Sequence, residues 1–322
     1  MKKQSRVIAF ALFFALSLLA LTGCGYTTVP PEAGPSAHTL RDDEGRTVHV
    51  PYEPERVAVL FSSLADMWCL AGGNVAITVG ESVDRGIVCE DAVLVDSGAG
   101  KSISVETLVA AAPDFVIGSA DIAAHKALVP ALTKAGIPFA LFRVDTLGDY
   151  ERVMKTMCAI TRRADLYESE AEDVRDEANA ILESVPALIE PPKILFVRVG
   201  SGYSATKAKR TEEHFVCAML AELGAINLAD GAPALSDGLN IEAILEMDPD
   251  YIFFSPMGNE ENAKAYMNGL LATAPWQALT AVAEGNYTYL PKSLFQYKPC
   301  DEWAEAYVML YGYLYEDFGT EK

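Results

Sequence analysis

The chain alternates between short, nearly continuous apolar runs and longer stretches whose apolar residues follow a helical period. The apolar runs predict strands at Thr47–Val50, Arg56–Phe61, Val75–Val79, Ala92–Val95, Phe115–Gly118, Phe139–Phe142, Lys193–Val199, Tyr251–Phe254 and Tyr287–Leu290. Continuous apolar strands that alternate with helices are typical of a mostly parallel sheet with helices on both faces. The pattern therefore predicts an α/β fold.

Three of the predicted helices have clear boundaries. The first spans Leu64–Ala71, with Ser62 and Ser63 as capping residues and a Gly-Gly pair after it. The others span Glu213–Gly224 and Trp303–Phe318, and the last of these is rich in aromatic residues. Each helix is placed to cover one face of a sheet.

Two phrases in different halves of the chain share one pattern. They read ISVETLVAAAPDFVI at residues 103–117 and LNIEAILEMDPDYIF at residues 239–253. Each places a glutamate, Glu106 or Glu242, seven residues before a Pro-Asp pair, and a capping residue, Ser104 or Asn240, two positions before the glutamate. The phrases lie 136 residues apart, and the strands RVAVLF and KILFVRV begin 137 residues apart. We interpret the chain as two related halves, with the functional site between them.

The segment between the halves, residues 149–190, lacks glycine and is rich in charge. Its apolar residues follow a helical period on both sides of an expected break near residues 162–165. The second stretch, of about 22 residues, would measure roughly 33 Å. We therefore predict a stiff connecting helix, rather than a loose hinge, between the halves.

The N-terminus predicts export. Lys2, Lys3 and Arg6 precede an uncharged apolar run of about fifteen residues, which is short for a membrane span. The run ends in Leu-Thr-Gly-Cys24, which resembles a bacterial lipobox and implies lipid attachment at Cys24. Residues 1–23 are the predicted signal peptide and residues 24–40 a flexible tether. An ordinary secretory signal with an incidental cysteine is the alternative.

Charge and cysteine content limit the classes of partner. Removal of the three basic signal residues changes the formal net charge from −20 to −23, which argues against nucleic acid or an anionic membrane surface as partner.

Five cysteines remain after Cys24, and no C-x-x-C pair occurs. Cys69, Cys158 and Cys217 lie in apolar helical patterns and are expected to be buried. We expect no essential disulfide framework.

The segment DEGRTVHVPYEPERVAVL, the paired E-x6-P-D phrases, AELGAINLAD at residues 221–230 and the long connecting helix resemble a known family. This family comprises the helical-backbone substrate-binding proteins of ABC importers for iron–siderophores, haem and vitamin B12. The resemblance implies an N-terminal lobe at residues 41–148, a connecting region at 149–190 and a C-terminal lobe at 191–322. It also implies a ligand in a shallow cleft between lobes that move little.

The resemblance also suggests roles for particular residues. Family members carry one surface acid on each lobe that pairs with arginines of the permease, and Glu106 and Glu242 stand at matching positions. First-turn acids also stabilise helices by interaction with the helix dipole, which is the simpler explanation. For haem, the axial ligands would be Met67 and His214, two positions that also suit a core methionine and a capping histidine.

Ligand contacts are expected on loops after the carboxyl ends of strands. The expected ligand contacts are Ser62, Ser63, Met67, Arg85, Arg143, Arg198, Tyr203, Arg210, His214 and Tyr297, with Asp84, Ser119, Asp121, Lys207, Ser255 and Met257 as further candidates. Arginine and tyrosine suit an anionic, metal-bearing chelate. We expect no cofactor of the protein's own, a monomer, and as partners a permease with its ATPase.

Other classes of function fit less well. The four histidines are scattered along the sequence, whereas a zinc or manganese site needs histidine and carboxylate side chains that converge. No cysteine cluster, G-x-S-x-G or Walker sequence indicates an enzyme, and SGAGKS at residues 97–102 lacks the P-loop spacing. The sequence thus predicts a lipid-anchored, extracytoplasmic binding protein for a ferric siderophore or haem. A cobalamin-binding relative and a surface binder without a transport role remain alternatives.

Overall fold

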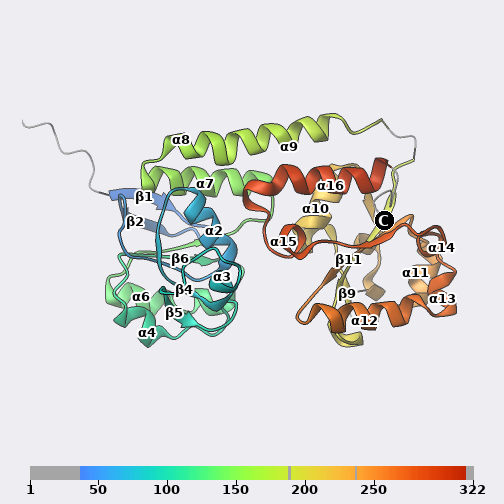
Figure 1. Ribbon diagram of the computed structural model, residues 1–322, viewed down its shortest axis with the longest axis horizontal. Helices are drawn as coiled ribbons and strands as arrows, with labels where there is room; N and C mark the ends of the chain where they lie inside the picture. Colours follow the sequence, from blue (N-terminus) through green and yellow to red (C-terminus); the bar gives the residue numbers. More distant parts are fainter. Residues whose placement is uncertain (1–36, 188–189, 236–237, 317–322) are drawn as a thin grey trace, which may run out of the picture. The chain divides into compact units, whose positions relative to one another are not determined.

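The computed structural model describes residues 37–187, 190–235 and 238–316 (Figure 1). The predicted signal peptide, Cys24 and most of the tether lie outside these residues. The described residues belong to one compact unit that begins at Ala37. Within them, every helix is too short or too polar to cross a membrane.

The first lobe is built on five parallel strands in the order β5-β4-β3-β6-β7. The strands are β3 (Val57–Val59), β4 (Val75–Val79), β5 (Val93–Asp96), β6 (Phe115–Ser119) and β7 (Phe139–Phe142). The helices are α2 (Ser62–Leu70), α3 (Gly80–Asp84), α4 (Val105–Ala110), α5 (Ala123–Lys126) and α6 (Val129–Ala135). An antiparallel pair, β1 (Ala37–Arg41) and β2 (Thr47–Pro51), precedes the sheet.

The second lobe repeats this scheme with parallel strands in the order β10-β8-β11-β12. The strands are β8 (Lys193–Val199), β10 (Ile226–Asn227), β11 (Tyr251–Pro256) and β12 (Tyr287–Tyr289), and β9 (Lys207–Ala208) pairs antiparallel with β8. The helices are α10 (Phe215–Glu222), α11 (Ile241–Met247), α12 (Glu260–Leu271), α13 (Ala274–Gln277), α14 (Thr280–Glu284), α15 (Lys292–Phe295) and α16 (Trp303–Tyr315). The predicted α/β fold with two related lobes is therefore confirmed.

The repeated phrases form the same local structure in both lobes. Ser104 caps α4 by accepting a hydrogen bond from the Thr107 backbone N–H, and Asn240 caps α11 by accepting from two backbone N–H groups. After each helix the residue before proline has a positive φ, 47° at Ala112 and 41° at Asp248. This left-handed residue stops the helix and turns the chain into the next strand.

The aspartate of each Pro-Asp pair joins that turn to the first strand of its lobe. Asp114 accepts hydrogen bonds from the backbone N–H groups of Glu55 (2.7 Å) and Arg56 (3.0 Å), just before β3. Asp250 accepts one from the N–H of Lys193 (2.7 Å), where β8 begins. The shared pattern therefore reflects a shared junction between two neighbouring parallel strands.

A layer of helices covers both lobes on one side, at the top of Figure 1. Helix α7 (Leu147–Thr161) ends at Arg162, whose φ is 58°. The chain then continues through α8 (Ala164–Tyr167), a π-helical turn (Glu168–Glu172) and α9 (Asp173–Glu183), and α9 packs against α16. The predicted break near residues 162–165 is observed there.

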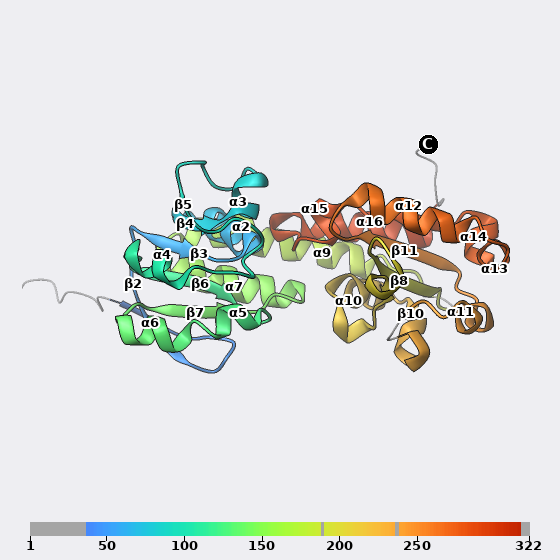
Figure 2. The ribbon, with the colours of Figure 1, turned by 90° about the horizontal axis from the view of Figure 1, so that it is seen from below.

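One hydrophobic core continues from the first lobe into the second through this layer. It joins Trp68 and Phe115 of the first lobe to Phe196 and Trp303 of the second, through residues of α7 and α9 such as Met154. In the view from below, strands β3–β7 lie at one end of this described part and β8–β11 at the other (Figure 2). Shared packing of this kind opposes large movements of one lobe against the other.

Some boundaries differ from the prediction. Ser62 and Ser63 lie inside α2, and the N-cap residue is Phe61. Helix α10 begins at Phe215 because a short 3₁₀ turn (Thr211–Glu213) and the capping His214 precede it. Cys158 and Cys217 are buried, whereas Cys69 is only half-buried near the end of α2.

Candidate functional site

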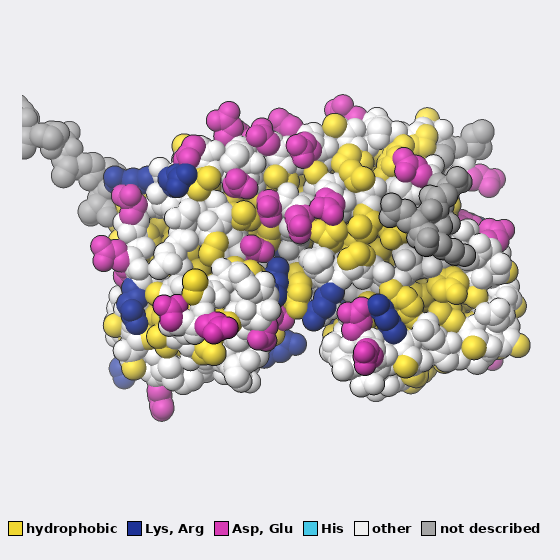
Figure 3. All heavy atoms as spheres, viewed as in Figure 1, with side chains coloured by type: hydrophobic (Ala, Val, Ile, Leu, Met, Phe, Trp, Pro, Cys, Tyr) yellow, Lys and Arg dark blue, Asp and Glu magenta, His cyan; other side chains and the backbone are white. Residues whose placement is uncertain are grey.

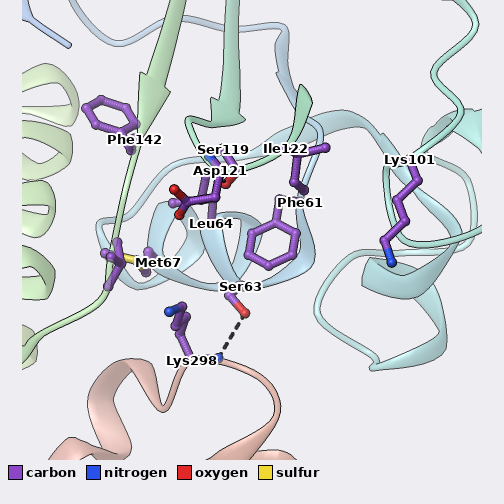
Figure 4. A pocket seen from close by; sticks show the side chains of 11 residues that line it. Phe61, Ser63, Leu64, Met67, Lys101, Ser119, Asp121, Ile122, Phe142 and Lys298 are labelled. Carbon is purple, nitrogen blue, oxygen red and sulfur yellow. Dashed lines mark hydrogen bonds between the residues drawn. The ribbon is translucent and has the colours of Figure 1, made fainter. Parts of the chain in front are cut away.

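A mostly apolar cavity of about 260 Å³ lies at the carboxyl ends of β3, β6 and β7 (Figure 4). It is lined by Phe61, Ser63, Leu64, Met67, Lys101, Ser119, Asp121, Ile122, Phe142, Val144 and Lys298. Lys298 is the contribution of the second lobe, and its backbone N–H donates a hydrogen bond of 3.2 Å to the Ser63 hydroxyl. We call this space the first-lobe cavity. Its place at the ends of parallel strands is where α/β folds bind ligands.

A buried histidine shapes the wall of the first-lobe cavity. His125 is fully buried; its Nδ1 accepts a hydrogen bond from the Ser119 backbone N–H (2.9 Å), and its Nε2 lies 2.8 Å from the Gly100 carbonyl oxygen. An accepting Nδ1 leaves the proton on Nε2, so the ring is neutral and donates to Gly100. Burial lowers the pKa of His125 and so favours this neutral form. His125 therefore fixes the loops that carry Ser119 and Lys101.

A second cavity, of about 470 Å³, is lined by residues of both lobes. The first lobe contributes Asp121, Asp145 and Thr146, and the second contributes Thr211, Glu212, Glu213, His214, Phe215 and Ala218. We call this space the interlobe cavity. Because Asp121 lines both cavities, the two adjoin and form one candidate binding site.

Most cations around this site are paired with carboxylates. Arg143 donates to Asp121 (2.6 Å), Arg210 pairs with Glu213 (3.1 Å), and Lys298 reaches Asp145 of the other lobe (3.0 Å). Figure 3 shows basic and acidic side chains on both sides of the hollow between the lobes. A ligand with anionic groups would therefore meet cations whose carboxylate partners it can replace.

Arg198 is a different kind of cation. It lies on β8, half-buried, and its buried Nε has no hydrogen-bond partner among the described residues. Burial lowers its pKa. The described residues include no carboxylate in a salt bridge with it. A desolvated guanidinium without a counterion attracts an anion strongly.

His214 lies beside this charge. Its ring stacks against Phe215 and Phe196, with centroids 4.9 and 4.6 Å away. Burial, and then the positive charges of Arg198 and Lys298, hold the pKa of His214 well below its usual range. Its Nδ1 accepts a hydrogen bond of 3.3 Å from the Val216 backbone N–H, so the proton of the neutral ring is on Nε2. This tautomer must change before Nε2 can bind a metal.

Three of the predicted ligand residues instead join the lobes around α2. Ser62 donates to Glu81 and accepts from Arg85, and the Arg85 guanidinium lies 4.1 Å from the centre of the Tyr297 ring. The nearby Cys300 thiol, fully buried, is 3.6 Å from the Ser63 carbonyl oxygen. These contacts hold the segment after α15 against the first lobe.

The structure brings only part of the predicted set together. Ser63, Met67, Ser119 and Asp121 line the first-lobe cavity, and Asp121 and His214 line the interlobe cavity. The lining of these cavities does not include Ser62, Arg85, Arg143, Arg198, Tyr203, Arg210 or Tyr297. Tyr203 is 61% exposed and packs close to Gly238.

Met67 and His214 do not occupy equivalent positions in the two lobes. Met67 is the sixth residue of α2 and has no exposed surface, whereas His214 is the N-cap of α10. The N-cap of α2 is Phe61, so Phe61 is the residue equivalent to His214. Met67 and His214 also line different cavities, which does not favour them as a pair of axial ligands.

Sequence reasoning missed several lining residues by one position. Phe142 and Val144 line the first-lobe cavity on either side of the nominated Arg143, and Lys298 follows the nominated Tyr297. Side chains alternate between faces in extended chain, so an error of one position selects the opposite face. The apolar character of Phe142 and Val144 was the available signal.

The sequence matches the family model described as periplasmic binding protein over residues 57–294, and the chain belongs to this family. No curated protein matches the chain. Among solved structures, the siderophore-binding protein BauB, bound to two acinetobactin molecules and ferric iron, has a TM-score of 0.69 at 14% identity, with 87% of this chain and 99% of that chain covered.

Two further structures have similar folds. The haem-binding protein RhuT from Roseiflexus sp. RS-1 has a TM-score of 0.66 at 18% identity, with 81% of this chain and 98% of that chain covered. SirA from Staphylococcus aureus, complexed with staphyloferrin B, has a TM-score of 0.67 at 17% identity, with coverages of 86% and 98%. At these identities the likeness shows the fold.

Family membership gives the class of function. Proteins of this family bind solutes outside the cytoplasm and are not enzymes, and the site described above lies where two lobes meet. In the described part of the chain, no group of three or more histidine, cysteine, aspartate or glutamate side chains is placed to hold a metal ion.

Proposed function

We propose that this protein is the solute-binding lipoprotein of an ABC importer and captures an anionic iron chelate, a ferric siderophore or haem, between its lobes. Family membership and solved neighbours that bind such ligands support this proposal. The observation that carries it is the pair of adjoining cavities lined by both lobes. Their volumes, about 260 and 470 Å³, lie near the size of small-molecule sites.

The chemistry of the cavity walls favours a ligand that is apolar in part and negatively charged in part. Phe61, Leu64 and Phe142 provide apolar surface, and Lys298 supplies positive charge on the wall itself. The charge of Arg198 acts from behind the wall, beside His214 of the interlobe cavity. The common core through the helical layer supports a site that is largely formed before the ligand arrives. A preformed site loses little conformational entropy on binding.

Delivery is the second part of the proposal. Glu106 and Glu242 are exposed, lie in the first turns of the short helices α4 and α11, and have no salt-bridge partner among the described residues. One acid on each lobe is thus free to pair with arginines of a permease. Lipid attachment at Cys24 would keep the protein near that permease.

The ligand is tested by absorption titration of the mature protein, carrying Cys24→Ser, with hemin, ferric siderophores and cobalamin. We expect tight binding of an anionic ferric chelate, and Arg198→Gln should weaken it roughly 10- to 100-fold, as loss of one charge-assisted bond does. Arg175→Gln is the matched control, because Arg175 pairs with Glu151 on the connecting helices. Equal weakening by both variants would contradict a role for Arg198.

The same titration separates the alternatives. A sharp shifted Soret band that disappears in Met67→Ala or His214→Ala would establish haem with these axial ligands. Binding of cobalamin alone would identify cobalamin, rather than an iron chelate, as the ligand. Binding of none of the three would refute the proposed ligand class.

Delivery is tested by uptake and by ligand-dependent stimulation of the permease ATPase. Reversal of both acids, Glu106→Lys with Glu242→Lys, should abolish transport and leave ligand affinity unchanged. The control is Glu246→Lys, an exposed glutamate on the same helix as Glu242. Weakened ligand binding in the double variant would contradict docking, and failure to stimulate any partner ATPase would favour a surface binder without transport.

A further inference from the structure

Two cysteines lie at the edge of the first lobe, away from the binding site. Cys69 is half-buried near the end of α2, and Cys89 is exposed in the segment between α3 and β5. Both line a cavity of about 420 Å³, whose wall also includes Arg56, Asn74 and Asp91. Two cysteines on the wall of one open cavity are both within reach of small thiol reagents.

The surroundings of Cys69 also affect its acidity. The pKa of the Cys69 thiol is raised to about 11, mainly by burial and also by the negative charges of Asp66 and ionised Cys89. The two cysteines therefore share one local electrostatic environment as well as one cavity. By contrast, Cys158, Cys217 and Cys300 are buried.

We infer that Cys69 and Cys89 form a reversible disulfide that ties the segment after α3 to the end of α2. The family functions outside the cytoplasm, where disulfides form and persist. The inference concerns the first lobe alone and does not depend on the identity of the ligand. It is compatible with a fold that needs no disulfide framework, because the lobe is packed without the bond.

Formation of the Cys69–Cys89 bond requires an oxidant. This oxidant is either a disulfide compound of low molecular weight or the disulfide of a thiol oxidoreductase. The exposed Cys89 thiolate attacks this disulfide, forms a mixed disulfide and releases one thiolate of the oxidant. The Cys69 thiolate then attacks Cys89 Sγ, forms the intramolecular bond and releases the second thiolate. Two electrons pass from the two cysteines to the oxidant, and two protons pass to solvent or to the released thiolates.

The bond would act on one wall of the candidate site. Helix α2 carries Ser63 and Met67, and Arg85 begins the segment that contains Cys89. Arg85 pairs with Asp66 of α2 at 3.2 Å. The oxidised form would hold Arg85 against α2 through a covalent bond as well as through this ion pair.

The test is oxidation of the purified protein with oxidised glutathione, followed by alkylation, peptide mapping and thermal unfolding. We expect a Cys69–Cys89 linked peptide and a rise in Tm of about 5–10 °C, from a closed loop of about twenty residues. Formation should become faster as the pH rises, because a thiolate is the attacking group in both exchange steps. Dithiothreitol should reverse both changes.

Cys89→Ser and Cys69→Ala should each abolish the linked peptide and the rise in Tm. Cys89→Ser is the safer variant for folding, because Cys89 is exposed. The matched control, Cys158→Ala, should keep both. A linked peptide between other cysteines, or a glutathione adduct on Cys89 with no linked peptide, would overturn the inference.

Discussion

The repeated Pro-Asp pairs offer a sharp test of which residues in the duplicated phrases are structural. Asp114 is half-buried and holds the backbone before β3 through the N–H groups of Glu55 and Arg56. Asp250 holds the start of β8 through a single N–H group, that of Lys193. The two aspartates share a position in the motif but differ in the number of donors.

The difference in donors gives the expected magnitudes. A hydrogen bond to a charged group stabilises by about 1.5–3 kcal/mol when buried, and partial exposure at both sites favours the lower end of that range. Asp114→Ala should therefore lower the free energy of unfolding by about 2–3 kcal/mol, and Asp250→Ala by about 1–1.5 kcal/mol. For a chain of this size these values correspond to a fall in Tm of about 4–8 °C and 2–4 °C.

Thermal and urea unfolding followed by circular dichroism measure both variants. The control is Glu106→Gln, which removes the charge of an exposed residue in the same phrase and should change stability by less than about 0.5 kcal/mol. Asp114→Ala should bind ligand and stimulate the permease normally at temperatures where it is folded. Glu106→Lys with Glu242→Lys should keep its stability and its ligand affinity but fail to stimulate the permease. Equal loss of stability in Asp114→Ala and Glu106→Gln would refute the reasoning.

Three further predictions concern the walls of the site and the helical layer. Because the pKa of His125 is lowered in the folded protein, the unfolded chain takes up the proton more readily. The stability that His125 contributes is therefore present above pH 6.5 and falls as the pH drops below that value. His125→Gln should flatten this part of a curve of stability against pH. Gly100→Ala should destabilise by more than about 2 kcal/mol, because a Cβ would lie 2.1 Å from the Leu60 carbonyl oxygen at a φ of 81°, as urea unfolding would reveal. Tyr307→Phe should lose about 1–3 kcal/mol in the same assay, because the buried Tyr307 hydroxyl donates to the Glu222 carboxylate; unchanged stability in any of these variants would contradict the contact on which it rests.

Much of the fold could be predicted because its signals are local. The apolar runs gave β4, β7 and β8 with their observed bounds, and the capping residues of α4 and α11 could be identified from the repeated phrase. The helix break near Arg162 followed from the change in apolar period. Strands β1, β9 and β10 were not predicted as strands, because short strands carry little periodic signal.

The candidate site was harder to predict, since each part of it depends on neighbours that are far apart in the chain. Lys298 reaches Asp145 across 153 residues, and no local pattern relates them. Arg143 follows β7 and Arg210 follows β9, and the nearest partners of both are carboxylates of the protein itself. His125 was not singled out, because a buried histidine that fixes two loops looks like any other helical residue in the sequence.

The sequence by itself determined the α/β alternation, the internal repeat and most strand positions, because apolar periodicity and capping act over a few residues. Only the tertiary structure decided which face of each strand end points into a cavity, which cations are already paired, and that Phe61 rather than Met67 matches His214. These properties depend on the packing of two lobes around a shared core, and a change of one residue in register reverses the direction of a side chain.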